Sequence, residues 1–151
     1  MRHGIVVGLT GQTGAGKSTV AEVLSRFGYK IIKADDAARL ATEKGSPVLK
    51  DLQRAFGEDI LHTDGTLNRK KLAERAFSSK EQTEKLNRIT HPFISHLMQK
   101  KIRGAFFDGY EAVILDASQL FEAGQDAFCN LVISVTAPEA LRKERICKRD
   151  H

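Results

Sequence analysis

Eight residues near the N-terminus match the spacing of a phosphate-binding loop. Residues 11–18 read Gly-Gln-Thr-Gly-Ala-Gly-Lys-Ser and agree with G-x-x-x-x-G-K-[ST] at each fixed position. Glycines allow a tight turn in which successive backbone N–H groups point at phosphate oxygens. The helix expected to follow adds its free N–H groups and its dipole. The segment therefore predicts a site for the phosphates of a nucleotide.

Side chains at the end of this loop have expected roles of their own. We expect Lys17 to contact the β- and γ-phosphates and the Ser18 hydroxyl to hold Mg²⁺, which makes ATP and Mg²⁺ the expected cofactors. Thr19 offers a further hydroxyl to a phosphate. The predicted nucleotide-binding residues are Gly11, Gln12, Thr13, Gly14, Ala15, Gly16, Lys17, Ser18 and Thr19.

Phosphoryl transfer to a hydroxyl also needs a carboxylate that takes the proton of that hydroxyl. Asp35 and Asp36 follow the second expected strand, and the carboxyl ends of parallel strands are where such sites form. The same position also suits acids that a helix dipole favours without any catalytic role. Asp116, at the end of a later strand, is placed either to orient Mg²⁺ through water or to end a core strand without a function.

The elements that must position these residues follow from the apolar pattern. Residues 4–10 form a short apolar run that predicts a buried strand. A helix is expected from Lys17 to Phe27, with one apolar stripe at Val20, Val23, Leu24 and Phe27, and Gly28 as its cap. Residues 29–33 then predict a second strand.

The middle of the chain is mostly helical in pattern. The expected helix boundaries are Ser46-Pro47 and Gly57 for one helix, starts at Asn68 and at Ser78 or Ser79, a longer helix from Pro92 towards Phe106, and a basic helix opened by a capping box at residues 136–139. Strands are expected at residues 112–116 and 131–135. Apolar strands separated by helices predict an α/β fold with a parallel sheet covered on both faces.

Composition narrows the class of protein. The 151 residues fit one domain, and no run approaches the roughly 20 apolar residues that span a bilayer. The N-terminus does not resemble a signal peptide, and Cys129 and Cys147 suggest neither a disulfide framework nor a metal site, so we expect a cytoplasmic protein. The net charge of +5 suits either a solvated, lysine-rich surface or the attraction of polyanions, but the basic residues are dispersed and Trp is absent. A phosphorylated small molecule is therefore expected as the partner, with no nucleic acid and no membrane.

A phosphate loop alone does not identify the reaction. A regulatory GTPase would carry an Asn-Lys-x-Asp segment and an Asp-x-x-Gly switch, whereas Asp116 is followed by Ala-Ser-Gln. A large mechanical ATPase would have a longer chain. A small-molecule kinase remains, with another nucleoside-phosphate kinase or a non-catalytic nucleotide-binding module as alternatives.

Several segments together resemble the dephospho-CoA kinase family. They occur in the family's order and extend over almost the whole chain: residues 8–19, 34–39 (Ala-Asp-Asp-Ala-Ala-Arg), 45–47, 56–57, 64–69 (Asp-Gly-Thr-Leu-Asn-Arg), 86–87, 91–92 and 120–122. The resemblance implies transfer of the ATP γ-phosphate to the ribose 3′-hydroxyl of dephospho-CoA. It also implies a single domain over residues 1–151 with a three-layer P-loop kinase fold, a helical substrate-binding insertion around residues 60–100, and a lid.

The resemblance also implies roles for particular residues. Asp35 matches the family's proposed catalytic base, and Arg39 matches an arginine that contacts substrate. Arg145 and Arg149, one turn apart, resemble lid arginines that neutralise the transferring phosphate, although an ordinary basic helix face has the same pattern. Further substrate contacts are implied for Asp64, Arg69 and His91. Asp64-Gly65 also suits an ordinary turn, and His91 also suits the start of a helix.

Three departures from the family pattern stand out. Lys33 replaces the usual aspartate two positions before Asp35, where it is expected either to depress the pKa of Asp35 or to pair with the substrate pyrophosphate. Ser118-Gln119 replaces the usual Pro-Leu. Family members usually continue beyond the position of His151 through the rest of the lid and a C-terminal helical region.

Overall fold

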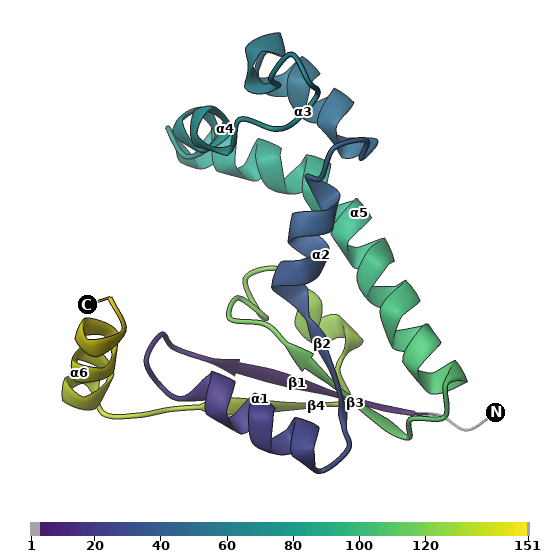
Figure 1. Cartoon of the computed structure of the whole chain (residues 1–151), viewed down its shortest axis with the longest axis vertical. Helices are drawn as coiled ribbons and strands as arrows, with labels where there is room; N and C mark the ends of the chain where they lie inside the picture. The colour runs from purple at the N-terminus through teal and green to yellow at the C-terminus, as the bar shows by residue number, and fades with distance from the viewer. Residues whose placement is uncertain (1–3, 151) are drawn as a thin grey trace. The chain divides into compact units, whose positions relative to one another are not determined.

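The structure, a computed structural model, describes residues 4–150. Its elements, in chain order, are β1 (Ile5–Gly11), α1 (Lys17–Arg26), β2 (Lys30–Lys33), α2 (Ala34–Ala41), α3 (Val48–Phe56), η1 (Glu58–Ile60), α4 (Arg69–Ala76), α5 (Lys80–Phe107), β3 (Ala112–Asp116), η2 (Gln125–Phe128), β4 (Leu131–Val135) and α6 (Glu139–Arg149). The chain divides into two compact units (Figure 1). We call residues 4–34 and 98–150 the sheet unit, and residues 35–97 the helical unit.

All four strands of the sheet unit run parallel, in the order β2-β3-β1-β4. The central strands β1 and β3 consist of apolar and β-branched residues with hardly any charge, as strands with neighbours on both sides do. The α/β fold with a parallel sheet, predicted from these runs, is confirmed. Parallel strands end at one edge, so the phosphate loop after β1 and the end of β3 come together there.

Helix α1 covers one face of the sheet. Ala21 is buried against Leu9 and Ile114, and Val20 and Leu24 pack at the margin of this cluster. The predicted stripe is wrong for Val23 and Phe27, whose side chains are exposed. The residues of α1 that pack on the sheet are therefore Val20, Ala21 and Leu24, and the small Ala21 takes the buried position that the pattern gave to Val23. The predicted end of α1 is confirmed, since Gly28 has φ 89° and its N–H donates to Ser25.

Parts of α5 and of the segment after β3 cover the opposite face. A Cβ on Gly4 would lie 2.1 Å from the ring of Phe106, which shows how closely the end of α5 approaches β1. A Cβ on Gly8 would lie 2.8 Å from both Leu120 and Cys129. Met98 of α5 is fully buried. The sheet unit therefore has three layers, with helical segments on both faces.

Strand β4 departs from the prediction that each strand is covered on both faces. It pairs with β1 only, among the residues that the structure describes, and is therefore an edge strand. Its residue Leu131 is 57% exposed, and Ile133 on the same face is also exposed. Both lie in register with residues of β1 on the α1 face, but α1 packs over β1 and β3 and leaves them open.

The helical unit has its own apolar core. Buried side chains from α3, η1 and α4 form it: Val48, Leu49, Leu52, Phe56, Ile60, Leu72 and Ala76. Three predicted boundaries are confirmed. Asn68 caps α4 by accepting a hydrogen bond from the N–H of Lys71 at 3.0 Å, Ser79 accepts one from Gln82 at 3.2 Å, and α3 ends before Gly57.

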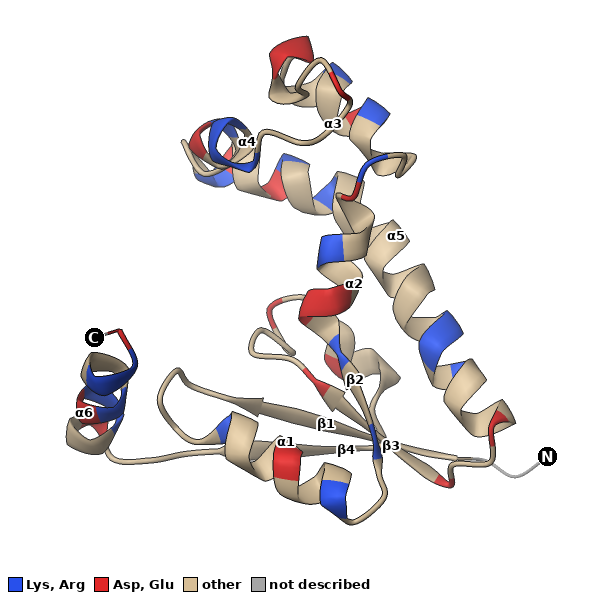
Figure 2. Ribbon diagram, in the orientation of Figure 1, with Lys and Arg blue, Asp and Glu red and all other residues tan. Residues whose placement is uncertain are grey.

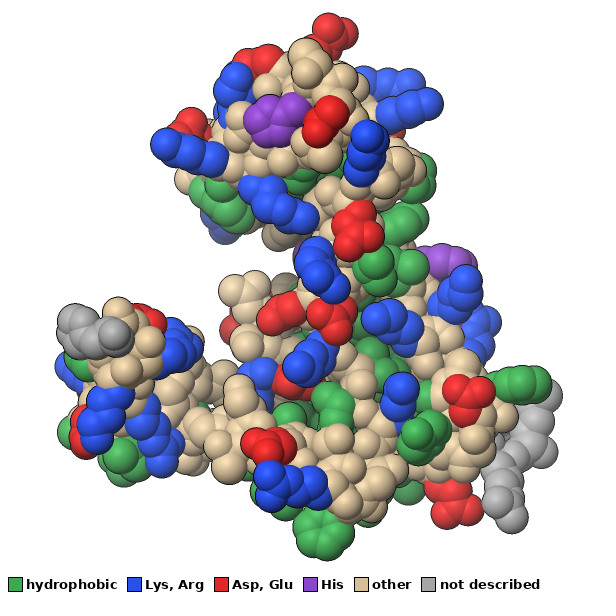
Figure 3. Space-filling view, viewed as in Figure 1, with side chains coloured by type: hydrophobic (Ala, Val, Ile, Leu, Met, Phe, Trp, Pro, Cys, Tyr) green, Lys and Arg blue, Asp and Glu red, His purple; other side chains and the backbone are tan. Residues whose placement is uncertain are grey.

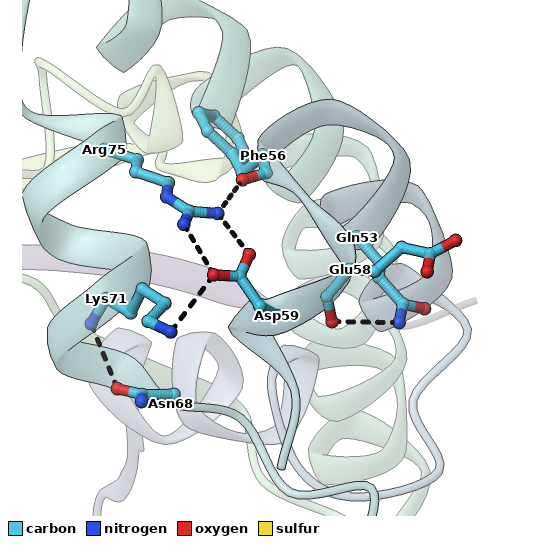
Figure 4. A network of polar contacts seen from close by, with 7 residues as sticks. All are labelled: Gln53, Phe56, Glu58, Asp59, Asn68, Lys71 and Arg75. Atoms are coloured by element: carbon cyan, nitrogen blue, oxygen red, sulfur yellow. Dashed lines mark hydrogen bonds and ion pairs between the residues drawn. The ribbon is translucent and has the colours of Figure 1, made fainter. Parts of the chain in front are cut away.

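A polar network closes this core on its outer side (Figure 4). Asp59 of η1 accepts hydrogen bonds from the Arg75 guanidinium at 2.6 and 2.8 Å and from the Lys71 ammonium at 3.1 Å. The same guanidinium donates to the carbonyl of Phe56. These hydrogen bonds, with the two positive charges behind them, hold the pKa of Asp59 well below its usual range, and Asp59 in turn raises the pKa of Arg75.

Two predicted helix starts are wrong. Pro92 does not open a helix but lies inside α5, which begins twelve residues earlier at Lys80. A proline lacks the N–H that would bond to the carbonyl four residues before it, yet the turns on either side sustain the helix. Helix α6 starts at Glu139, and no described side chain caps it. Thr136 therefore stands outside the helix, and the predicted capping box does not form.

Candidate active site

The phosphate loop between β1 and α1 has the backbone that its glycines allow. Gly14 and Gly16 have φ values of 81° and 102°, in the region that other residues rarely adopt. The N–H of Ala15 donates to the carbonyl of Gln12 at 3.0 Å and closes the turn. A Cβ on Gly14 would lie 2.7 Å from the backbone oxygen of Arg142, so α6 also requires a glycine there.

The start of α1 suits an anion. Its N-cap is the left-handed Gly16, which has no side chain that could cap the first N–H groups of the helix. The first turn carries no acidic residue that would compete with an anion. Its free N–H groups and the helix dipole therefore favour a phosphate, and the residues present fit the expected ATP.

Lys17 and Asp116 form an ion pair beside this loop. The Lys17 ammonium bonds Oδ1 of Asp116, and the two side chains are only 17% and 11% exposed. Asp116 ends β3, next to β1 in the sheet, which explains why a residue 99 positions away meets the loop lysine. The structure thus brings the predicted phosphate lysine and the predicted metal-orienting aspartate together.

The oxygen donors near the loop fit Mg²⁺, but they do not fit a metal ion that takes all of its ligands from the protein. The described residues contain no group of three His, Cys, Asp or Glu side chains that could hold a metal ion. Ser18 is exposed at the start of α1, and Asp116 lies beside Lys17. Mg²⁺ commonly takes one or two protein oxygens and completes its shell with phosphates and water.

The two predicted lid arginines have different surroundings. Arg145 of α6 donates to the carbonyls of Gly14 and Ala15 at 3.1 and 3.2 Å, so it lies directly against the loop. Arg149 instead pairs with its neighbour Asp150 at 3.1 Å and is exposed. Basic residues occupy much of the α6 surface, as Figures 2 and 3 show. Of these two arginines, the structure brings Arg145 to the nucleotide-binding loop.

The helical unit contains a cavity of about 450 Å³. Three predicted site residues line it: Asp35 and Arg39, one turn apart on α2, and Arg69 at the start of α4. The rest of its wall is mostly apolar. It comes from α2 and the residue after it (Ala38 and Thr42), from the segment between η1 and α5 (Leu67, Leu72, Ala73, Ala76 and Phe77) and from α5 (Leu86, Thr90 and Ile94). One carboxylate and two guanidinium groups thus meet an apolar wall.

Two other predicted substrate contacts lie elsewhere. Neither Asp64 nor His91 is among the described residues that line this cavity. The Asp64 carboxylate accepts hydrogen bonds from the N–H and hydroxyl of Thr66 at 2.9 and 2.6 Å, which lowers the pKa of Asp64. His91 borders a separate open hollow of about 670 Å³ on α5, with Arg88 and Pro92 among its neighbours. Asp64 therefore has the contacts of a turn residue.

The apolar part of the cavity was not predicted from the sequence. Phe77, which follows α4, lines it and is 66% exposed. Ile94 of α5, which carries no sequence signal of a site, also lies on the cavity wall. An aromatic residue just after a helix end is a weak sequence signal of a binding cavity. The cavity forms only when the three helices α2, α4 and α5 pack together.

Comparison with known proteins agrees with this geometry. Residues 5–151 match the family model described as dephospho-CoA kinase. The chain is 47% identical over 140 residues to the dephospho-CoA kinase of Corynebacterium efficiens, and the alignment covers 93% of this chain and 70% of the relative. It is 41% identical over 149 residues to the dephospho-CoA kinase of Listeria monocytogenes serotype 4b, covering 98% of this chain and 74% of the relative.

Solved structures show the same fold. The crystal structure of TT1252 from Thermus thermophilus superposes with a TM-score of 0.83 at 31% identity, over 97% of this chain and 73% of that one. The dephospho-CoA kinase from Campylobacter jejuni gives a TM-score of 0.66 at 18% identity, over 96% of this chain and 95% of that one. The family match extends over nearly the whole chain and includes both the phosphate loop and the cavity. The chain therefore belongs to the dephospho-CoA kinase family.

Proposed function

We propose that the chain transfers the γ-phosphate of ATP to the ribose 3′-hydroxyl of dephospho-CoA, giving coenzyme A and ADP. The observation that carries this proposal is the cavity in which Asp35, Arg39 and Arg69 meet an apolar wall. An acceptor that carries phosphates as well as an apolar arm suits this cavity, because the arginines match the phosphates and the apolar wall matches the arm. The phosphate loop, with Lys17 and Arg145 beside it, supplies the donor side that a kinase needs.

In the proposed step, Asp35 removes the proton of the acceptor hydroxyl as its oxygen attacks the γ-phosphorus. The bond between that phosphorus and the bridging oxygen of ADP breaks, and ADP leaves with the electron pair. Lys17 and the N–H groups of α1 stabilise the negative charge on the phosphates. We assign to Arg145 the neutralisation of charge on the transferring group, and to Arg39 and Arg69 the binding of phosphates of the acceptor.

Mg²⁺, when bound, would neutralise charge on the β- and γ-phosphates. Ser18 and Asp116 are the residues proposed to hold it, Ser18 directly and Asp116 through water. No helix of residues 4–150 combines the length and apolar character needed to cross a membrane. The family implies a small-molecule substrate, whereas a cytoplasmic location and the lack of nucleic-acid and membrane partners stay predictions. The lid role of Arg149 and the substrate contacts of Asp64 and His91 also stay predictions.

The direct test is ATP-dependent phosphorylation of dephospho-CoA by the 151-residue chain, with AMP and UMP as control acceptors. Phosphorylation of dephospho-CoA alone would support the proposal. Phosphorylation of AMP or UMP alone would instead assign the chain to nucleoside-phosphate kinases. Binding of ATP without transfer to any acceptor would contradict a catalytic role for this chain.

A further inference from the structure

Lys33, one of the three departures from the family pattern, is a cation at the same sheet edge as the phosphate loop. It is the last residue of β2 and lies in register with Asp116 at the end of β3. Asp116 in turn lies in register with Leu9 of β1. Residues directly opposite one another on neighbouring strands share a face, and the strands lie about 4.8 Å apart. Lys33 and Asp116 are therefore adjacent side chains.

That shared face is the one to which α1 contributes Lys17. Leu9 and Ile114, which alternate with the residues of the other face, belong to the core beneath α1. Lys17, the first residue of α1, reaches Asp116 from this side. Asp116 thus stands between two lysines, one on α1 and one on β2. Lys33 is exposed, and its four-carbon stem is long enough to span neighbouring strands.

We propose that Lys33 is a second phosphate-binding cation of the nucleotide site and contacts the terminal phosphate. Asp116 neutralises only one of the two lysines, so the group carries a net positive charge before nucleotide binds. Lys17 must turn from Asp116 towards the β- and γ-phosphates when ATP arrives. Lys33, in register with Asp116 on the neighbouring strand, would then compensate the charge of that carboxylate and free Lys17 for the nucleotide.

The strand order indicates which phosphate Lys33 contacts. The loop follows β1, and the order β2-β3-β1 places Lys33 beyond Asp116 as seen from the loop. The loop follows β1 and binds the α- and β-phosphates, so these lie nearest β1. The phosphate nearest β2 is therefore the γ-phosphate. The inference rests on the proposed use of ATP and is independent of the identity of the acceptor.

The test is binding of ATP, ADP and AMP, each with Mg²⁺ and without an acceptor, measured by calorimetry. Lys33→Met should weaken ATP binding about tenfold, the usual weight of one charge-assisted contact, and ADP binding less than threefold. Lys33→Arg should retain ATP binding. Lys30→Met is the matched control, since Lys30 is an exposed lysine at the opposite end of the same short strand.

Each outcome decides the inference. ATP binding that weakens selectively in Lys33→Met, with Lys30→Met unchanged, supports it. Unchanged ATP binding, an equal loss for all three nucleotides, or an equal loss in both variants overturns it. Because no acceptor is present, a failure of dephospho-CoA phosphorylation in the wild-type chain would leave this result intact and would count against the proposed function alone.

Discussion

The phosphate loop and the cavity of the helical unit are built in different ways. The loop takes its chemistry mainly from backbone N–H groups within eight consecutive residues, and two glycines give it its shape. The cavity takes its chemistry from side chains that are up to 59 positions apart, from Asp35 to Ile94, on three helices. A local sequence pattern can therefore define the first site, whereas the second exists only after the helices pack.

This difference predicts which substitutions damage which substrate. Changes at the loop should affect every reaction of ATP, because each needs the same phosphate contacts. Changes at the cavity should affect the acceptor and leave nucleotide binding intact. Four predictions follow in decreasing order of expected effect; the first three test this separation, and the fourth tests the polar network that stabilises the helical unit.

Lys17→Ala should lower kcat/KM for transfer by about 10³-fold, because it removes a cation that stabilises the transferring phosphate. It also leaves Asp116, which is only 11% exposed, without its present partner, so ATP affinity should fall as well. Steady-state kinetics with ATP varied would measure both effects. Retention of most of the activity would mean that the loop is not the phosphate site.

Asp35→Asn should lower kcat by about 10²-fold and leave ATP affinity unchanged, as expected for loss of a general base. Asp36→Asn is the matched control, because Asp36 is the next residue and makes only a long 4.0 Å ion pair with Arg39. Comparable losses in both variants would argue against a base at position 35. A loss of ATP affinity in Asp35→Asn would instead indicate a role in positioning metal.

Arg39→Ala should raise the KM for dephospho-CoA about tenfold and leave the KM for ATP unchanged, since one charge-assisted contact is lost. Phe77→Ala should also raise the KM for dephospho-CoA, because it removes apolar contact with the acceptor. Arg54→Ala on α3 removes an exposed arginine that lies outside the cavity and serves as the control. A rise in the KM for ATP in either cavity variant would break the separation of the two sites.

Asp59→Asn should give the smallest effect, on stability alone. The pKa of Asp59 is lowered in the folded chain, so its carboxylate contributes stability that is fully present above the unfolded pKa of about 4 and is lost as the pH falls below it. Thermal unfolding of wild type should therefore lose more stability between about pH 4 and pH 2 than unfolding of the variant. Parallel curves would show that the network contributes nothing.

The parts of the fold that the sequence predicted share a physical cause. The loop and the boundaries at Asn68 and Gly57 depend on backbone requirements that one or two residues meet locally. The errors arose where distant packing decides. Pro92 lies inside α5 rather than at the start of a helix as predicted, and the apolar cavity wall, Ile94 included, was not predicted because residues of α2, α4 and α5 form it together. No periodicity in one segment carries that information.

The ion pair between Lys17 and Asp116 could be predicted only in part from the sequence. Lys17 is predicted from the phosphate-loop pattern, whereas Asp116, at the end of its strand, suits either a residue that orients Mg²⁺ or one without a function. The parallel sheet predicts that the ends of neighbouring strands converge. The docking of Arg145 on loop carbonyls was not foreseen in that form. It depends on where the last helix turns back, which the failed capping box at Thr136 did not predict.

The contact between Gly14 and α6 restricts which sequences this fold can accept. The phosphate-loop pattern leaves position 14 open to any residue. Here a side chain at that position would require a positive φ and would also meet the Arg142 backbone oxygen at 2.7 Å. Among natural variants of this chain, a residue other than glycine at position 14 should therefore be accompanied by a shifted or altered last helix, so that the two segments vary together.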